Sequence, residues 1–172
     1  YSECSSDYDK DSEETQLFFK MVQNIMHYAV TKQTAAEIIY DRADAERPHM
    51  GLTSWKNAPD GRVIKSDVTV AKNYLSEKEV DSLNRLSNAF IDIAEQHAED
   101  HILMTMADWS ALLQRYMDLN NRPLLPNAGR VTHEQAVEKA LTEYDKFRVI
   151  QDREIMSDFD RQLKLLFGDK GD

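Results

Sequence analysis

Apolar residues recur at spacings of three and four along most of the chain, which is typical of helices buried on one face. A second pattern marks where such helices begin: a capping residue is followed three positions later by an acidic or amide side chain. This capping pattern begins at Asp11, Thr34, Ser76, Thr105 and Thr132. Ser66 is predicted to cap one further helix. The chain is therefore predicted to be all-α, a single compact domain of about six helices.

The last of these helices is unusually long. It is predicted to run from Thr132 to near Gly168, which corresponds to about 50 Å at the rise of an α-helix. A compact domain of this size cannot cover that length, so the second half either projects or folds back onto the domain. If it projects, an apolar stripe becomes a possible oligomer seam. The stripe consists of Ile155, Phe159, Leu163 and Leu166.

Length and charge limit the possible functions. With 172 residues the chain is long enough for one domain with its own core. We expect an acidic linker at 1–10, a helical domain at 11–150 and a helical extension at 151–172. The net charge is −10, from 31 acidic and 21 basic side chains, which opposes binding to phosphate backbones or anionic membranes. The chain by itself is expected to bind DNA poorly.

Cysteine content and hydropathy predict a cytoplasmic protein with no membrane partner. The single cysteine, Cys4, cannot form an intramolecular disulfide, and no apolar run is long enough to span a bilayer. The chain begins with Tyr1 instead of Met and has no leader pattern. We therefore expect it to be part of a longer protein with a further N-terminal module.

Polar residues concentrate in and around Thr34 to Lys72. If they converge, they form a candidate site, which consists of Gln23, Asn24, His27, Glu37, Arg42, Asp44, Lys65, Lys72 and Asn73. As an enzyme, this site would act on a nucleotide or phosphodiester, with Glu37 and Asp44 holding a divalent ion. The cationic side chains among the nine would stabilise phosphate charge. The ordinary alternative for His27 is a ring nitrogen bonded to a backbone carbonyl.

Metal and nucleotide motifs are weak. Glu37, Asp41 and Asp44 would share one helical face, but acidic stripes are usually solvated or ion-paired. His97 and His101 have a zinc-chelating spacing without the glutamate of an HExxH motif. Neither a P-loop nor a GxGxxG pattern occurs. The sequence therefore predicts no metal and no cofactor.

A basic island interrupts the acidic chain. Between Arg47 and Lys72 two acidic residues, Asp60 and Asp67, stand against five basic ones, so the local charge is +3. The five are Arg47, Lys56, Arg62, Lys65 and Lys72. This island could hold a phosphate or an acidic partner. Trp55 beside it could stack on a base, although a single tryptophan more often fills a core.

Several blocks of sequence carry a resemblance to a known family. They are VQNIMHYAV at 22–30, TAAEIIYDRADAERPHMGLTSW at 34–55, KSDVTVAKNYLSEKE at 65–79 and LNR at 83–85. In this order they resemble the C-terminal region of RhuM-like virulence proteins, over about Asp7 to Phe147. One departure is Lys32, where the similar sequences read glycine, so we expect a differently shaped helix end.

The resemblance implies a winged-helix or Bro-N-like DNA-binding module before this region, so that DNA would be bound only through that module. Some similar proteins carry a Fic-like label, but no HPFxxGNG-type motif is present, and the resemblance assigns no biochemical activity. The sequence therefore favours a non-enzymatic helical interaction module that forms a homo-oligomer, most simply a dimer, in a virulence-associated DNA-binding protein. The alternative is the metal-dependent enzyme described above.

Overall fold

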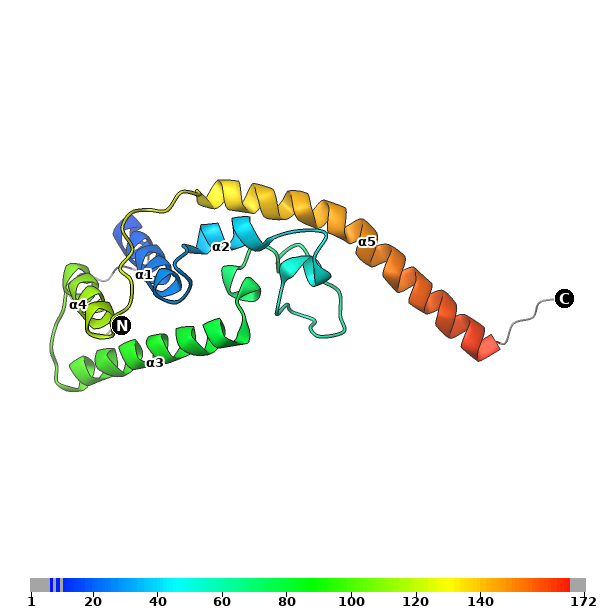
Figure 1. The fold of residues 1–172 in the computed structure, drawn as a ribbon. Coiled ribbons are helices and arrows are strands. Elements are labelled where there is room, and N and C mark those ends of the chain that lie inside the picture. Colours follow the sequence, from blue (N-terminus) through cyan, green and yellow to red (C-terminus); the bar gives the residue numbers. More distant parts are fainter. Residues whose placement is uncertain (1–6, 8, 10, 168–172) are drawn as a thin grey trace. The chain divides into compact units, whose positions relative to one another are not determined.

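The computed structural model describes residues 7, 9 and 11–167, with side chains up to Glu154 (Figure 1). All of the regular elements in this part of the chain are helices, joined by turns and loops, and no strand occurs in it. Its elements are α1 (Glu13–Thr31), α2 (Ala35–Arg42), the 3-10 turns η1 (Pro48–Gly51) and η2 (Ala71–Tyr74), α3 (Glu77–Glu99), α4 (Met106–Leu119) and α5 (His133–Phe167). The predicted all-α class is confirmed, with five α-helices in the described residues instead of about six.

The capping pattern located most of the helix starts. In three of the predicted pairs the hydroxyl of the cap residue accepts the N–H of the residue three positions on, and the acidic side chain of that residue accepts the N–H of the cap residue. The confirmed pairs are Thr34 with Glu37, Ser76 with Glu79 and Thr105 with Asp108. The first helix is the exception, because Ser12 and not Asp11 caps α1: its hydroxyl accepts the Thr15 N–H at 3.1 Å.

The helix predicted to start at Ser66 does not form, and that prediction was wrong. Residues 65–69 are turns, and only η2 follows before α3. Two causes are visible. Val68, Thr69 and Val70 are consecutive β-branched residues, which lose side-chain freedom in a helix. The Asp67 carboxylate also binds backbone N–H groups outside any helix, which stabilises the turn conformation instead.

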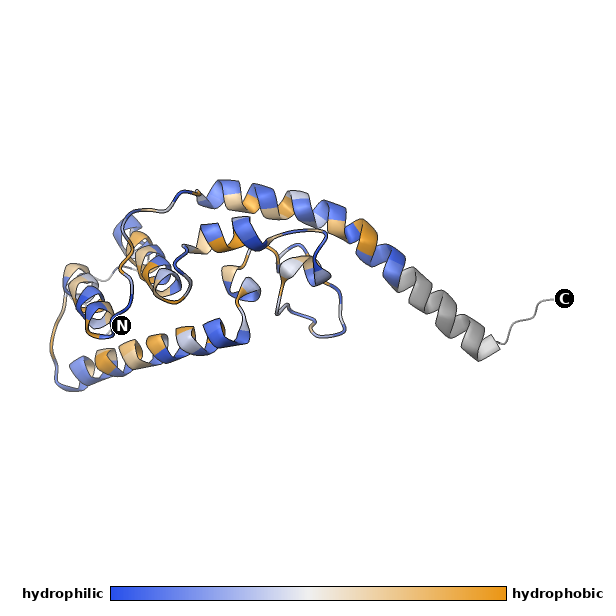
Figure 2. Ribbon diagram, viewed as in Figure 1, coloured by the Kyte–Doolittle hydropathy of each residue, from blue (hydrophilic) through white to orange (hydrophobic). Residues whose placement is uncertain are grey.

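The chain divides into two compact units. Unit 1 comprises residues 1–38 and 75–132, and unit 2 comprises residues 39–74 and 133–172. In unit 1, α1 packs against both α3 and α4. Apolar and polar positions alternate along these helices as one-sided burial requires (Figure 2). The centre of this core is α4, where Trp109, Leu113 and Met117 are fully buried; Phe90 of α3 meets the Trp109 ring edge-on at 6.1 Å.

Unit 2 is built on α5, which packs against η1. Many of its buried residues lie outside the α-helices: Met50, Val63, Val68 and Tyr74 are all at most 2% exposed. The helix continues without a break from His133 to Phe167, so its second half does not turn back on the first. The side chains of the predicted seam, Ile155, Phe159, Leu163 and Leu166, lie outside the described residues.

Lys32 ends α1 in a conformation that glycine favours. Its backbone has φ 59° and ψ 25°, in the left-handed region, and its N–H donates to the Tyr28 carbonyl at 2.8 Å. The helix thus has the left-handed C-terminal turn found at many helix ends. A lysine in this conformation costs about 1 kcal/mol relative to glycine because its Cβ crowds the following carbonyl.

Candidate functional site

Glu37 is the most constrained of the predicted site residues in unit 1. Its side chain is buried, and both carboxylate oxygens accept backbone N–H groups: Oε2 from Thr34 at 2.8 Å and Oε1 from Arg130 at 2.9 Å. Burial alone would raise the pKa of this carboxyl group, but the N–H groups of Arg130 and Thr34 outweigh it and lower the pKa below its usual range. Glu37 is therefore a charged residue that joins the start of α2 to the loop before α5.

Gly129 shows how closely that loop approaches Glu37. It has φ +90°, and a Cβ placed on it would lie 2.9 Å from Cγ2 of Thr34 and 3.4 Å from Oε1 of Glu37. Only glycine fits such a conformation and space without displacement. The sequence indicates that Gly129 lies in a loop. It could not show the close approach of this loop to Thr34 and Glu37, which are more than 90 positions away.

The polar residues of α1 mostly serve α2 or their own helix. Asn24 accepts the Ala35 N–H on Oδ1 at 3.3 Å, so it joins Thr34 and Glu37 at the start of α2. His27 is buried, and its Nδ1 lies 2.7 Å from the Gln23 carbonyl oxygen. This is the ordinary arrangement that the sequence left open for His27. The Gln23 side chain is exposed.

In unit 2 the predicted site residues hold loops. Arg42 donates from Nη1 to the Tyr74 carbonyl at 3.0 Å, and Asn73 donates from Nδ2 to the Asp67 carbonyl at 2.9 Å. Asp44 accepts the Glu46 N–H and pairs with Arg47, its Oδ2 lying 3.4 Å from Nε. Lys65 and Lys72 are exposed. Each of these bonds is to the backbone or to a near neighbour in the sequence.

The proposed acidic stripe does not persist along a helix. α2 ends at Arg42, so Asp44 lies beyond the helix that would align it with Asp41. Within the part of the chain that the structure describes, no group of three or more His, Cys, Asp or Glu residues is arranged to hold a metal ion. Similarly, His97 binds the Ile93 carbonyl within α3, whereas His101 follows the end of that helix with φ 55°.

A left-handed turn at residues 49–51 organises the loop after α2. His49, Met50 and Gly51 have φ values of 51°, 61° and 82° in succession. A Cβ on Gly51 would lie 2.3 Å from the Arg42 carbonyl oxygen, so glycine is required there. The turn buries Met50 completely and places the exposed His49 ring on Trp55, with centroids 4.4 Å apart and planes 29° apart.

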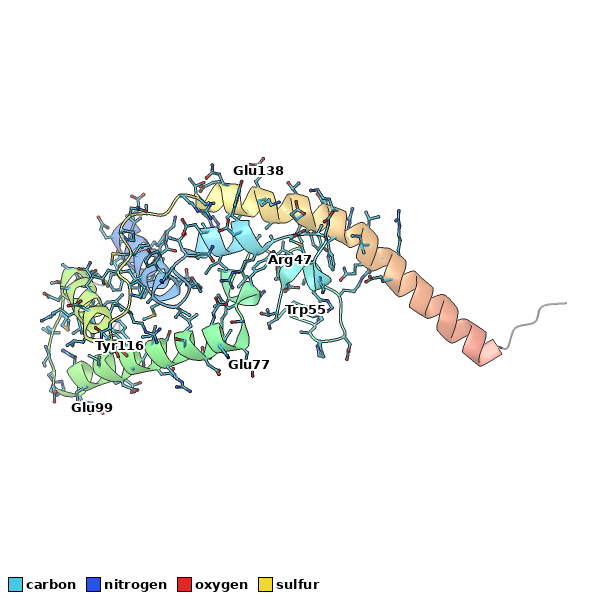
Figure 3. All side chains as sticks on the ribbon, viewed as in Figure 1. Arg47, Trp55, Glu77, Glu99, Tyr116 and Glu138 are labelled. Atoms are coloured by element: carbon cyan, nitrogen blue, oxygen red, sulfur yellow. The ribbon has the colours of Figure 1, made fainter. Side chains whose placement is uncertain are left out.

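Trp55 itself belongs to the core of this loop. It is 8% exposed, and its Nε1 donates to the Gly61 carbonyl at 2.7 Å. Figure 3 labels Trp55 and Arg47 on this segment. The sequence did not predict the stacking of His49 on Trp55. The sequence RPHMG at 47–51 indicates a turn, but it does not show which side chain the turn places against Trp55.

The comparison with known families gives one decisive result. The model for the Virulence protein RhuM family matches residues 1–156. The chain belongs to that family. No curated protein and no solved structure matches it. Among the described helices of this RhuM-family chain, none is both long and apolar enough to cross a membrane. The resemblance found in the sequence blocks is thereby confirmed.

The sequence missed a buried carboxylate of this RhuM-family chain that contacts two lysines. Glu143 on α5 is 7% exposed. Its Oε2 accepts the Ala45 N–H at 3.0 Å, and its Oε1 lies 2.8 Å from the amino groups of both Lys139 and Lys146. The lysine hydrogen bonds and the Ala45 N–H hold the pKa of the carboxyl group at about 2, far below its usual range. One signal was available, since Glu143 interrupts the apolar spacing between Ala140 and Phe147.

Gln151, also missed, acts on the loop of the basic island. Its amide accepts the Val63 N–H on Oε1 at 2.8 Å and donates from Nε2 to the Val63 carbonyl at 3.2 Å. The backbone N–H and carbonyl of the buried Val63 are thus both satisfied by a single side chain. No local pattern could reveal this contact, because the partners are 88 residues apart.

Proposed function

We propose that this RhuM-family chain is a non-enzymatic oligomerisation module whose second copy binds along the C-terminal half of α5. In the intact virulence protein such a dimer would position DNA-binding modules in pairs, as symmetric readers of DNA require. The observation that carries the proposal is the continuity of α5 to Phe167, which keeps the predicted seam on one helix.

The described residues at the start of this segment are consistent with a seam. Val149 and Ile150 are 47% and 40% exposed, although both are large and apolar. Farther along the sequence, the seam residues Ile155, Phe159, Leu163 and Leu166 recur at spacings of four, four and three. Val149 lies two heptads before Leu163 and is therefore in register with it. A repeat of this kind on a continuous helix favours pairing with another helix.

The bonds of the polar residues favour this function over the metal-dependent enzyme. Glu37 and Arg42, which would hold a metal ion and a phosphate in the enzyme, bind backbone groups of their own units. Those bonds account for the burial and charge of both side chains in structural terms. An interaction function then requires no further role for them.

The test is the mass in solution of the chain and of a seam variant. Sedimentation equilibrium over a wide concentration range is expected to give twice the monomer mass for the unaltered chain. The double substitution Phe159→Asp with Leu163→Asp places charges in the seam and is expected to give the monomer mass. Circular dichroism at low temperature checks that helix content outside the seam is retained.

Ser157→Asp is the matched control. It adds the same side chain to the same helix, but at a position nearly opposite Phe159, because two residues turn an α-helix by about 200°. This control is expected to remain dimeric. A monomer mass for the unaltered chain, or an equal loss of dimer in the control, would contradict the proposal.

A further inference from the structure

The basic island in unit 2 is only partly neutralised by its surroundings. Arg47 pairs with Asp44, and Arg62 pairs with Asp152 of α5. The remaining three cations, Lys56, Lys65 and Lys72, are exposed, and no described carboxylate forms a salt bridge with any of them. In a chain of net charge −10, three such lysines in one segment are a local departure from the overall charge.

The backbone segments that carry the three lysines are joined through one residue, although up to 16 positions separate the lysines in the sequence. The buried residue Asp67 draws their segments to one point. Its Oδ1 accepts the N–H of Lys56 at 3.2 Å, and its Oδ2 accepts the N–H of Ile64, the neighbour of Lys65, at 2.9 Å. Its carbonyl accepts the side chain of Asn73, the neighbour of Lys72, at 2.9 Å.

An exposed aromatic ring is stacked on the residue that precedes Lys56. Lys56 directly follows Trp55, and the exposed His49 ring stacks on Trp55 at 4.4 Å. Two successive left-handed residues, His49 and Met50, hold the ring there, and the full burial of Met50 anchors the turn. Left-handed residues other than glycine persist only where their surroundings fix them. The turn therefore presents the exposed His49 ring, stacked on the buried Trp55, at the start of the segment that carries the lysines.

We propose that His49, Lys56, Lys65 and Lys72, here called the lysine surface, bind single-stranded nucleic acid. The lysines contact successive phosphates of the backbone, and a base stacks on the His49 ring. Basic groups interleaved with aromatic rings are the usual platform for single strands, whose unstacked bases expose a π-face. An acidic peptide would satisfy the lysines but would make no use of the stacked ring, so the ring decides between these partners.

The negative net charge of the chain opposes this binding only weakly at physiological salt. A net charge of −10 repels a polyanion at long range, but at physiological salt charges are screened beyond about 8 Å. Contacts with the lysine surface therefore dominate once the strand is bound. Three phosphate contacts predict a slope of about −2 for log K against log salt concentration, because each contact contributes about −0.7 with single strands.

The experiment measures fluorescence anisotropy of a labelled oligo-dT with the full chain, titrated at several salt concentrations. We expect binding with the slope given above. Exchanging Lys56, Lys65 and Lys72 together for Gln is expected to weaken binding at low salt at least tenfold and to flatten the slope. His49→Asn retains a residue that tolerates the left-handed conformation and is expected to weaken binding several-fold while leaving the slope unchanged.

The matched control exchanges Lys20, Lys78 and Arg85 for Gln, which removes three exposed cations from unit 1. It changes the net charge equally and is expected to lose less than twofold in affinity. Absence of binding by the unaltered chain, or equal weakening in the control, overturns the proposal. A labelled poly-glutamate peptide that binds as tightly as oligo-dT also overturns it, in favour of an acidic protein partner. None of these outcomes depends on the α5 seam.

Discussion

The two units of the chain are stabilised in different ways. Unit 1 buries apolar side chains between regular helices, with Trp109 and Leu113 of α4 fully enclosed. The starts of α3 and α4 are closed by local pairs such as Ser76 with Glu79. Unit 2 buries less regular backbone and secures it with single polar side chains, among them Glu143, which binds the Ala45 N–H across 98 positions of sequence.

This difference explains why single polar residues contribute more to stability in unit 2 than in unit 1. In unit 1 most of the stability comes from the area of apolar surface buried, which many side chains share. In unit 2 each non-helical segment has unpaired backbone groups, and a buried N–H or carbonyl without a partner costs about 1–3 kcal/mol. A few polar residues therefore carry a large part of the stability of unit 2.

The largest effect is expected from the core of unit 1. Leu113→Ala removes a fully buried side chain and leaves a cavity, so it should lower the free energy of unfolding by about 3 kcal/mol. The chain has two tryptophans, Trp109 in unit 1 and Trp55 in unit 2. Denaturant titration in a Trp55→Phe background then follows unit 1 through Trp109.

The control for this change is Gln114→Ala, which alters the neighbouring exposed position of α4 and should change the free energy of unfolding by less than about 0.5 kcal/mol. If Leu113→Ala proved as mild as the control, the contrast between an apolar unit 1 and a polar unit 2 would be lost.

An intermediate effect is expected from Glu143 in unit 2. Glu143→Gln removes the charge that pairs with Lys139 and Lys146 and should cost about 2 kcal/mol. In a Trp109→Phe background the fluorescence of Trp55 follows the denaturant unfolding of unit 2. The midpoint of this unfolding should shift to a lower denaturant concentration. Glu138→Gln, an exposed change on the same helix, should leave the transition in place.

The same contact predicts a dependence on pH. The pKa of Glu143 is about 2 in the folded chain, below its ordinary value of 4.5, so the carboxylate stabilises the fold at neutral pH. This stabilisation is complete above about pH 5 and is lost as the pH falls from 4.5 through 2. The difference between the unaltered chain and Glu143→Gln should therefore narrow over that range. A constant difference would mean that the charge is not its source.

The smallest effect, and the only stabilising one, is expected at the end of α1. Lys32→Gly places glycine at a left-handed position and should raise the free energy of unfolding by up to about 1 kcal/mol, less the entropy that glycine gains in the unfolded chain. Lys20→Gly, at an exposed position inside α1, should lower it by about 1 kcal/mol. Thermal unfolding of both variants measures these changes in stability. If both variants are destabilised, the left-handed turn is not a source of strain.

Local patterns predicted unit 1 better than unit 2 for a physical reason. A capping box such as Thr105 with Asp108 is complete within four residues, so the sequence alone contains it. The helix expected from Ser66 did not form partly because of the β-branched run at 68–70, and partly because the Asp67 carboxylate binds the backbone N–H of Lys56, 11 positions away. Long-range contacts limited the prediction of the candidate site in the same way. The sequence singled out Glu37, but it could not predict the bond between Glu37 and Arg130, which are 93 positions apart.

Gln151 replaces what a neighbouring strand would normally provide. Its side-chain amide offers Val63 one acceptor and one donor, as the peptide group of an adjacent strand would. The substitutions that this position tolerates follow from that role. Glutamate has nearly the same shape but would set a negative oxygen against the Val63 carbonyl, and asparagine is one methylene too short to keep both bonds. Over evolutionary time we expect the loop at 56–62 to vary in sequence more freely than the single amide that secures it.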